Sequence, residues 1–117
     1  MVSNRFANNS GSNATRGIIC NGYNPSPSGA VQNTIEFLTI STTGNTTDFG
    51  DTTQARYSTF GSCCSGTRMV VPGGYVAPSV VNTIDSFKIA TTGNAMDFGD
   101  LATAAGPTST SNGHGGL

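Results

Sequence analysis

The chain has 117 residues and a formal net charge of −1, from 5 basic and 6 acidic side chains. Only 35% of it is apolar and 9% charged, against roughly 45–50% and about 25% in an average globular chain. Glycine, serine, threonine and asparagine supply about half of the residues. This composition excludes a coiled coil or helical bundle and offers no basic surface for nucleic acid, and the length fits one domain.

The chain carries no sign of a membrane span or a disulfide framework. No stretch approaches the ~18 consecutive apolar residues of a transmembrane helix, and residues 1–9 lack the apolar region of a signal peptide. We therefore expect synthesis in a cytosol and no membrane insertion. Cys20, Cys63 and Cys64 have no C-x-x-C spacing, and adjacent cysteines rarely bridge each other, so we expect reduced thiols packed as small hydrophobes.

The chain contains an internal duplication. Residues 33–56 align with 82–105 without a gap at an offset of 49, sharing the phrases Thr-Thr-Gly-Asn and Asp-Phe-Gly-Asp. A second pair, residues 15–23 and 67–75, is offset by 52. The extra three residues fall in a Pro- and Ser-rich loop after Tyr23, which is where insertions are tolerated. The pattern predicts a duplicated supersecondary unit.

Each copy predicts four short strands. Apolar runs at 18–20 and 69–71 predict inner strands, alternating segments at 34–42 and 83–91 predict the next ones, and Asp-Phe-Gly-Asp at 48–51 and 97–100 predicts a third pair. The last strand of the first copy runs to Cys64, and its counterpart at 104–111 is expected to be a weak edge strand. No window has helical periodicity. The chain is therefore expected to be all-β, with the strand count of a propeller blade in each copy.

These residues resemble kelch repeats. Gly73-Gly74 stand for the kelch glycine pair, Phe49 and Phe98 for the aromatic anchor, and Arg56 for the outer-strand arginine. The first copy departs from the pattern with Asn21-Gly22, and the second with Ala105 in place of arginine.

Longer sequence phrases make the resemblance more specific. TRMVVPGGY, IATTGNAMDFGDL and the closing SNGHGGL are similar to kelch-like repeats in structural and tail-associated proteins of tailed phages of marine bacteria, of the cyanophage type. The resemblance covers essentially the whole chain. It implies β-propeller blades in a virion component, with Phe49, Phe98, Gly73 and Gly74 as structural anchors and no catalytic residues.

The duplication predicts one kelch-like domain over 1–117, with units at about 15–66 and 67–117 and an extra outer segment at 3–12. Propellers use about four to eight blades, so two blades cannot close a ring. We therefore expect a homo-oligomer: a trimer with six blades is favoured over a dimer or tetramer. The segment at 3–12 is a candidate to pair with the last blade of a neighbouring copy.

The candidate binding residues are two tyrosines and two arginines. Tyr23 and Tyr75 begin the variable loops (24–32 and 76–81), where recognition residues tend to lie. Arg16 and Arg68 precede the inner strands in equivalent places. The arginines are expected to bond loop carbonyls or a carboxylate such as Asp51 or Asp100 on the next blade; the alternative is a contact to a sugar or anion.

We expect no catalytic residues, metal site or cofactor. The Asp-Phe-Gly-Asp phrases lack the rest of a kinase and the spacing of a calcium loop, so their aspartates are expected to cap turns. His114 is the only histidine and is expected in a turn or at an interface. Glu36 and Asp85 hold the same repeat position, which favours a scaffold role over an acid/base pair.

Together these features predict a non-enzymatic structural protein of a phage virion, either a tail-fibre or tail-associated subunit or a capsid decoration, that self-assembles and presents loops. Its partners would be copies of itself and other virion proteins. The alternative is an adhesin module at a fibre tip that binds a receptor or a glycan on the host surface. An enzyme is not expected.

Overall fold

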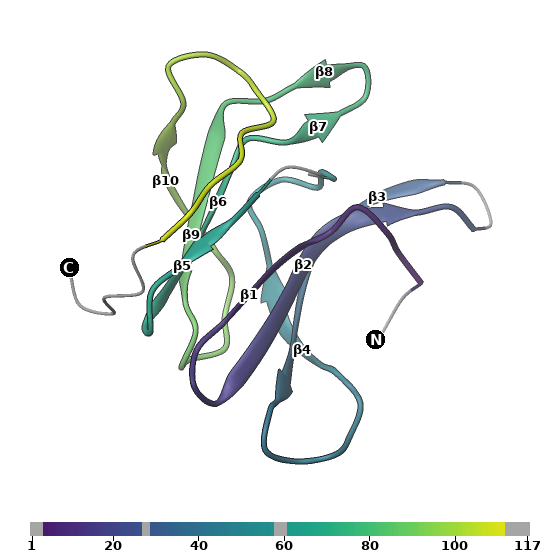
Figure 1. The fold of residues 1–117 in the computed structure, drawn as a ribbon. Coiled ribbons are helices and arrows are strands. Elements are labelled where there is room, and N and C mark those ends of the chain that lie inside the picture. Colours follow the sequence, from purple (N-terminus) through teal and green to yellow (C-terminus); the bar gives the residue numbers. More distant parts are fainter. Residues whose placement is uncertain (1–3, 27–28, 58–60, 112–117) are drawn as a thin grey trace.

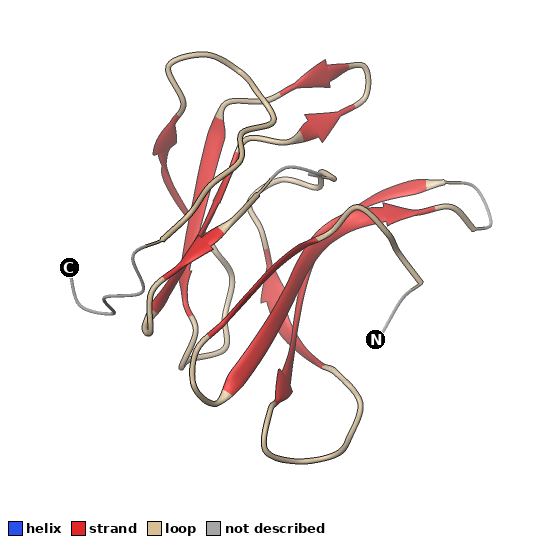
Figure 2. Ribbon diagram, viewed as in Figure 1, coloured by secondary structure: helices blue, strands red, loops and turns tan. Residues whose placement is uncertain are grey.

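The computed structural model describes residues 4–26, 29–57 and 61–111, and all regular structure in these ranges is β-strand (Figure 2). The expected all-β class is confirmed. No helix occurs among the described residues, so none there is long and apolar enough to cross a membrane. The strands form two four-stranded antiparallel sheets and a small two-stranded sheet.

The first sheet is an antiparallel meander in chain order (Figure 1). Its strands are β1 (Asn9–Ser12), β2 (Arg16–Asn24), β3 (Ala30–Thr39) and β4 (Thr47–Asp51). β1 pairs with β2 of its own chain, with Asn9 opposite Cys20. The segment at 3–12, which was a candidate to pair with a neighbouring copy, therefore supplies an edge strand of this sheet.

The second sheet repeats the meander with a hairpin inserted. Its order is β5 (Cys63–Cys64), β6 (Arg68–Pro72), β9 (Thr83–Lys88) and β10 (Met96–Asp100), and the inserted hairpin is β7 (Tyr75–Val76) with β8 (Ser79–Val80). In the first sheet, β2 and β3 simply extend to the end of their hairpin, pairing as far as Asn24 and Ala30. The two copies thus differ most in the loops where the sequence placed the insertion.

Two expectations about strand limits are corrected. β3 begins at Ala30 rather than Thr34, because the hairpin ladder continues past the β-bulge between Cys20 and Gly22. Residues 104–111 form no strand. That segment carries Gly106-Pro107, and proline cannot donate to a strand ladder.

The core lies between the two four-stranded sheets. Ile18, Cys20, Ile35 and Phe49 from the first sheet meet Met69, Val71, Phe87, Ile89 and Ala95 from the second and its β9–β10 loop. The sheets approach closely because Gly11 on β1 leaves room for Met69: a Cβ there would lie 3.0 Å from the Met69 sulfur. One seam between sheets therefore supplies the core of the described structure.

Equivalent residues of the two copies differ in burial according to this seam. Ile89 has no exposed surface, whereas Ile40, which holds the same place in the first copy, is 52% exposed. Both follow strands of the same pattern, so the difference comes from cover: the first sheet covers the face that carries Ile89, whereas no described sheet covers the equivalent face of the first sheet, which carries Ile40.

This pair gives a matched test of the seam. Ile89→Ala should lower the free energy of unfolding by about 2–5 kcal/mol, because it removes buried methyl groups and leaves a cavity. Ile40→Ala should cost less than about 1 kcal/mol, because half of that side chain already meets water. Urea unfolding in dilute solution measures both. Equal losses for the two variants would contradict the position of the core.

Candidate binding surface

Four aromatic side chains form a row that joins the two copies of the repeat. The ring centroids are 5.4 Å apart for Phe6 and Tyr23, 5.7 Å for Tyr23 and Tyr57, and 5.1 Å for Tyr57 and Tyr75. All three contacts are edge-to-face, a favourable arrangement for aromatic rings. We call Phe6, Tyr23, Tyr57 and Tyr75 the aromatic row.

The row is built by one backbone pairing used twice. Phe6 and Tyr23 exchange N–H···O bonds of 3.0 and 2.9 Å, and Tyr57 and Tyr75 exchange bonds of 3.1 and 2.8 Å. For each sheet, the segment that precedes the first strand crosses the end of the inner strand and is held there by these two backbone hydrogen bonds. The duplication thus brings Tyr23 and Tyr75, both predicted as binding residues, to the two sides of Tyr57.

The row is partly exposed and uncharged. Phe6 is 55% exposed, and the three tyrosines are half-buried. Desolvation, followed by the neighbouring Tyr75 and Tyr23, raises the pKa of Tyr57, so its hydroxyl stays protonated at neutral pH. A surface of aromatic edges with neutral hydroxyls suits an uncharged polar ligand better than an ion.

The two predicted arginines lie away from the row. Arg16 begins β2, seven residues before Tyr23, which places the two about 23 Å apart along the strand at ~3.3 Å per residue. Arg16 donates to the Ile89 carbonyl at 2.9 Å and lies over the Phe37 ring at 4.6 Å. The expected bond to a loop carbonyl is thus found for Arg16, with Ile89 as the acceptor. The four predicted binding residues do not form one site.

The charged side chains of the described interior form two ion pairs, one for each four-stranded sheet. Arg5 meets Glu36 at 2.8 Å and Arg56 meets Asp85 at 2.9 Å, and all four side chains are fully buried. Each arginine comes from the segment that leads into a sheet, and each carboxylate from the third strand of that sheet. The expected scaffold role of Glu36 and Asp85 agrees with this burial.

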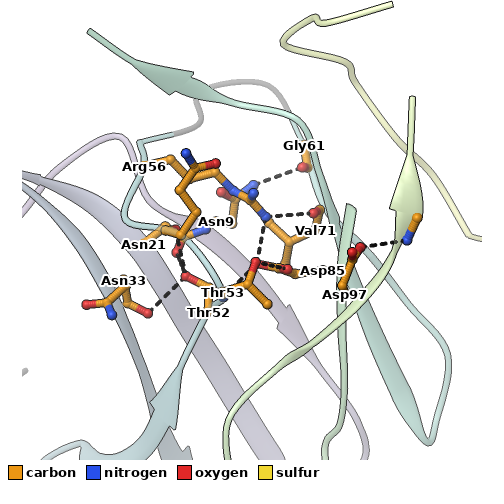
Figure 3. A network of polar contacts seen from close by, with 12 residues as sticks. Asn9, Asn21, Asn33, Thr52, Thr53, Arg56, Gly61, Val71, Asp85 and Asp97 are labelled. Atoms are coloured by element: carbon orange, nitrogen blue, oxygen red, sulfur yellow. Dashed lines mark hydrogen bonds and ion pairs between the residues drawn. The ribbon is translucent and has the colours of Figure 1, made fainter. Parts of the chain in front are cut away.

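Asp85 is also bonded to the segment that joins the sheets (Figure 3). It accepts from the Thr53 amide at 3.1 Å and the Thr53 hydroxyl at 2.5 Å, while Arg56 also donates to the Val71 carbonyl at 3.1 Å. Burial lowers the pKa of Arg56, and Asp85 opposes that shift. The pair fixes the crossing segment to the second sheet.

The predicted glycine anchors act through close backbone approach. Gly73 has φ 58°, and a Cβ there would lie 2.3 Å from the Ala105 carbonyl oxygen, while Gly74 donates to that oxygen at 3.1 Å. The first copy uses Asn21 at φ 59° before Gly22, and asparagine tolerates that conformation. Gly22 likewise donates to the Arg56 carbonyl at 3.1 Å.

The two predicted aromatic anchors, Phe49 and Phe98, differ in burial. Phe49 is 3% exposed and lies 5.4 Å from Phe87 across the seam. Phe98, expected to be a structural anchor like Phe49, is 55% exposed, and none of the sheets in the described residues covers that face of β10. The aspartates before them cap turns as expected: Asp48 accepts from Gly50, and Asp97 from Gly99.

The cysteines are free thiols, as predicted. Cys20 is buried, and Cys63 and Cys64 are half-buried. Burial raises the pKa of Cys20 to about 12, so this thiol is not a nucleophile at neutral pH. Among the described residues no three His, Cys, Asp or Glu side chains gather in a metal-binding group. His114 lies outside the described residues.

Arg5, Phe6 and Tyr57 were given no role from the sequence. The available signal is short: Arg5-Phe6 precedes the first sheet as Arg56-Tyr57 precedes the second, each an arginine followed by an aromatic residue. A two-residue match carries little weight until the backbone pairings are known.

A scan against protein-family models and a search of curated proteins both gave no match.

The second ion pair predicts a large stability effect. Arg56→Met should lower the free energy of unfolding by about 3–5 kcal/mol, because it leaves the buried Asp85 carboxylate without its counter-charge. Lys88→Met is the matched control: that cation is exposed, and its loss should cost less than about 0.5 kcal/mol. Urea unfolding at neutral pH compares the two. Similar midpoints would show that the pair contributes nothing.

Proposed function

We propose that this protein is a non-enzymatic structural subunit that assembles with copies of itself and presents loops, in the manner of a component of a tailed-phage virion. The observation that carries the proposal is the single seam: each four-stranded sheet uses one face in the core, and apolar side chains lie uncovered on the others. Ile40, Met96 and Phe98 are 52%, 68% and 55% exposed. Exposed apolar side chains of this size, gathered on sheet faces, favour assembly.

The place in a virion rests on the sequence resemblance. The duplicated four-stranded meander, with Gly73-Gly74 in the second copy and the buried Arg56, supports the kelch-like unit that the resemblance implies. Under this proposal each sheet is a propeller blade, and three copies supply the six blades of a closed ring. The chain's chemistry adds support, because its buried charges are already committed to ion pairs.

Self-assembly is the first test. Sedimentation velocity of the purified chain should show a complex larger than a monomer that dissociates on dilution, because the exposed sheet faces need a partner. Three copies would support the closed ring. A monomer at every concentration would refute assembly, and absence of the chain from purified phage particles by mass spectrometry would refute the virion role.

The aromatic row favours a second function, binding of a host-surface glycan. Sugar rings offer apolar C–H faces that pack on aromatic side chains and hydroxyls that bond to phenol groups. The row lies where the inner strands give way to the variable loops, which is where binding residues are usually presented. Tyr23 and Tyr75, predicted as binding residues, both belong to it.

A glycan array with the purified assembly tests this second function. Binding of a defined glycan is expected, and Phe6→Ala should weaken it at least about tenfold, because this residue is the most exposed ring of the row and aromatic contacts dominate such interfaces. Lys88→Ala, an exposed change at the far end of β9, should leave binding intact. Equal binding by both variants would separate the row from any glycan site.

A further inference from the structure

We propose that copies of this chain join head to tail, the second sheet of one copy docking on the first sheet of the next as the two sheets dock within the chain. The inference rests on the self-assembly proposed above and adds the surfaces. The head face is the outer side of the first sheet with its β3–β4 loop, formed by Leu38, Ile40, Gly44 and Asn45. The tail face is the outer side of the second sheet, formed by Arg68, Met96, Phe98, Gly99 and Asp100.

The seam inside the chain is the template for this contact. Where β4 meets the β9–β10 loop, Gly93 donates to the Phe49 carbonyl at 2.8 Å and Ala95 donates to the Asp51 carbonyl at 2.8 Å. The Asp51 amide in turn donates to the Asn94 side-chain oxygen at 3.0 Å. Backbone and side chain thus join the end of one sheet to the loop of the next.

The chain carries a second, unused set of the same residues. At the offset of 49, Phe98 and Asp100 are the counterparts of Phe49 and Asp51, and Asn45 is the counterpart of Asn94. All three are exposed. The phrases Asp-Phe-Gly-Asp and Thr-Thr-Gly-Asn are each present twice, yet only one of each takes part in the seam.

Glycines show that the unused set has room for the same approach. A Cβ on Gly50 would lie 2.5 Å from the Gly93 carbonyl oxygen, so the seam requires glycine there. Its counterpart at the offset of 49 is Gly99 on the tail face, and no atom lies within 4 Å of a Cβ position there. A second copy therefore meets no obstruction at Gly99.

The head face is also hollowed beside Gly44. A hollow of about 220 Å³ is lined by Phe37, Leu38, Thr39, Thr42, Thr43, Gly44, Asn45 and Thr47. At the corresponding loop of the second sheet, Phe49 fills the space beside Phe87. The geometry places Phe98 of a neighbouring copy at the hollow.

Arg68 fits the same scheme. Arg16 crosses the seam to the Ile89 carbonyl, and Arg68 is its counterpart at the offset of 52. The Arg68 guanidinium lies over Phe98 at 5.8 Å and has no hydrogen-bond acceptor among the residues that the structure describes. The Ile40 carbonyl of a second copy is the equivalent acceptor.

The charges of such a junction balance. Arg56 enters the seam to meet Asp85, but its counterpart at the end of the second copy is Ala105. An incoming first sheet brings Glu36 already paired with its own Arg5. An arginine at 105 would therefore be a surplus buried cation, and alanine avoids that cost.

Because head and tail are different surfaces, the contact is heterologous and is tested by variants that disable one face each. Phe98→Asp removes the tail and Ile40→Asp removes the head, and each should weaken self-association of its own variant at least about tenfold. Val80→Asp, on a residue 42% exposed and outside both faces, should not. Circular dichroism and thermal unfolding in dilute solution check that each variant folds.

Mixing the two disabled variants gives the decisive measurement. Phe98→Asp retains a head and Ile40→Asp retains a tail, so an equimolar mixture should form dimers and nothing larger by sedimentation velocity. Asn45→Cys mixed with Asp100→Cys should form a disulfide-linked dimer on mild oxidation, whereas neither variant alone should. Reduction and mass spectrometry identify the bond.

The outcomes separate this inference from the proposed function. If the wild-type chain assembles but Phe98→Asp and Ile40→Asp assemble equally well, the surfaces are wrong while self-assembly stands. If each variant alone still forms dimers, the contact is isologous and the inference fails. If the wild-type chain stays monomeric, the self-assembly on which both rest is refuted.

Discussion

A β-sheet has two faces, and covering them is the constraint on which this structure depends. The chain makes two sheets of the same design and places the inner face of one against the inner face of the other. That seam contains the core: the largest fully buried apolar side chains, Ile18, Ile35, Met69 and Ile89, all lie in it. The segment between β4 and β5 crosses the seam and ties the sheets together through Arg56 and Thr53.

The duplication explains why equivalent residues have different surroundings. Phe49 and Phe98 share their neighbours in sequence and their place in a strand, yet one is buried and the other exposed. The local sequence determines that each lies on a strand with a tight bulge at the following glycine. Among the described residues, Phe49 is covered because the second sheet packs on the face that carries it, whereas no described sheet packs on the equivalent face that carries Phe98.

The parts of the fold that are visible in the sequence are those with short-range causes. Strand alternation, the Thr-Thr-Gly-Asn turns and the glycine pair at Gly73 all predicted features that the structure contains, because each is set by a few adjacent residues. The aromatic row and the Arg5–Glu36 pair were not predicted, because they join segments 17 to 34 residues apart. Nothing in the alternation of β3 indicates which strand lies opposite Glu36 or what counter-charge it finds.

The buried ion pairs have a consequence for the history of such chains. Arg5 and Glu36 form the ion pair of the first sheet, and Arg56 and Asp85 that of the second, so each carboxylate finds its counter-ion in the segment that leads into its own sheet. Recombination that adds a whole sheet together with the segment that leads into it therefore leaves no buried charge without its counter-charge. Chains with additional sheets can therefore arise in one genetic step without leaving a buried charge unpaired.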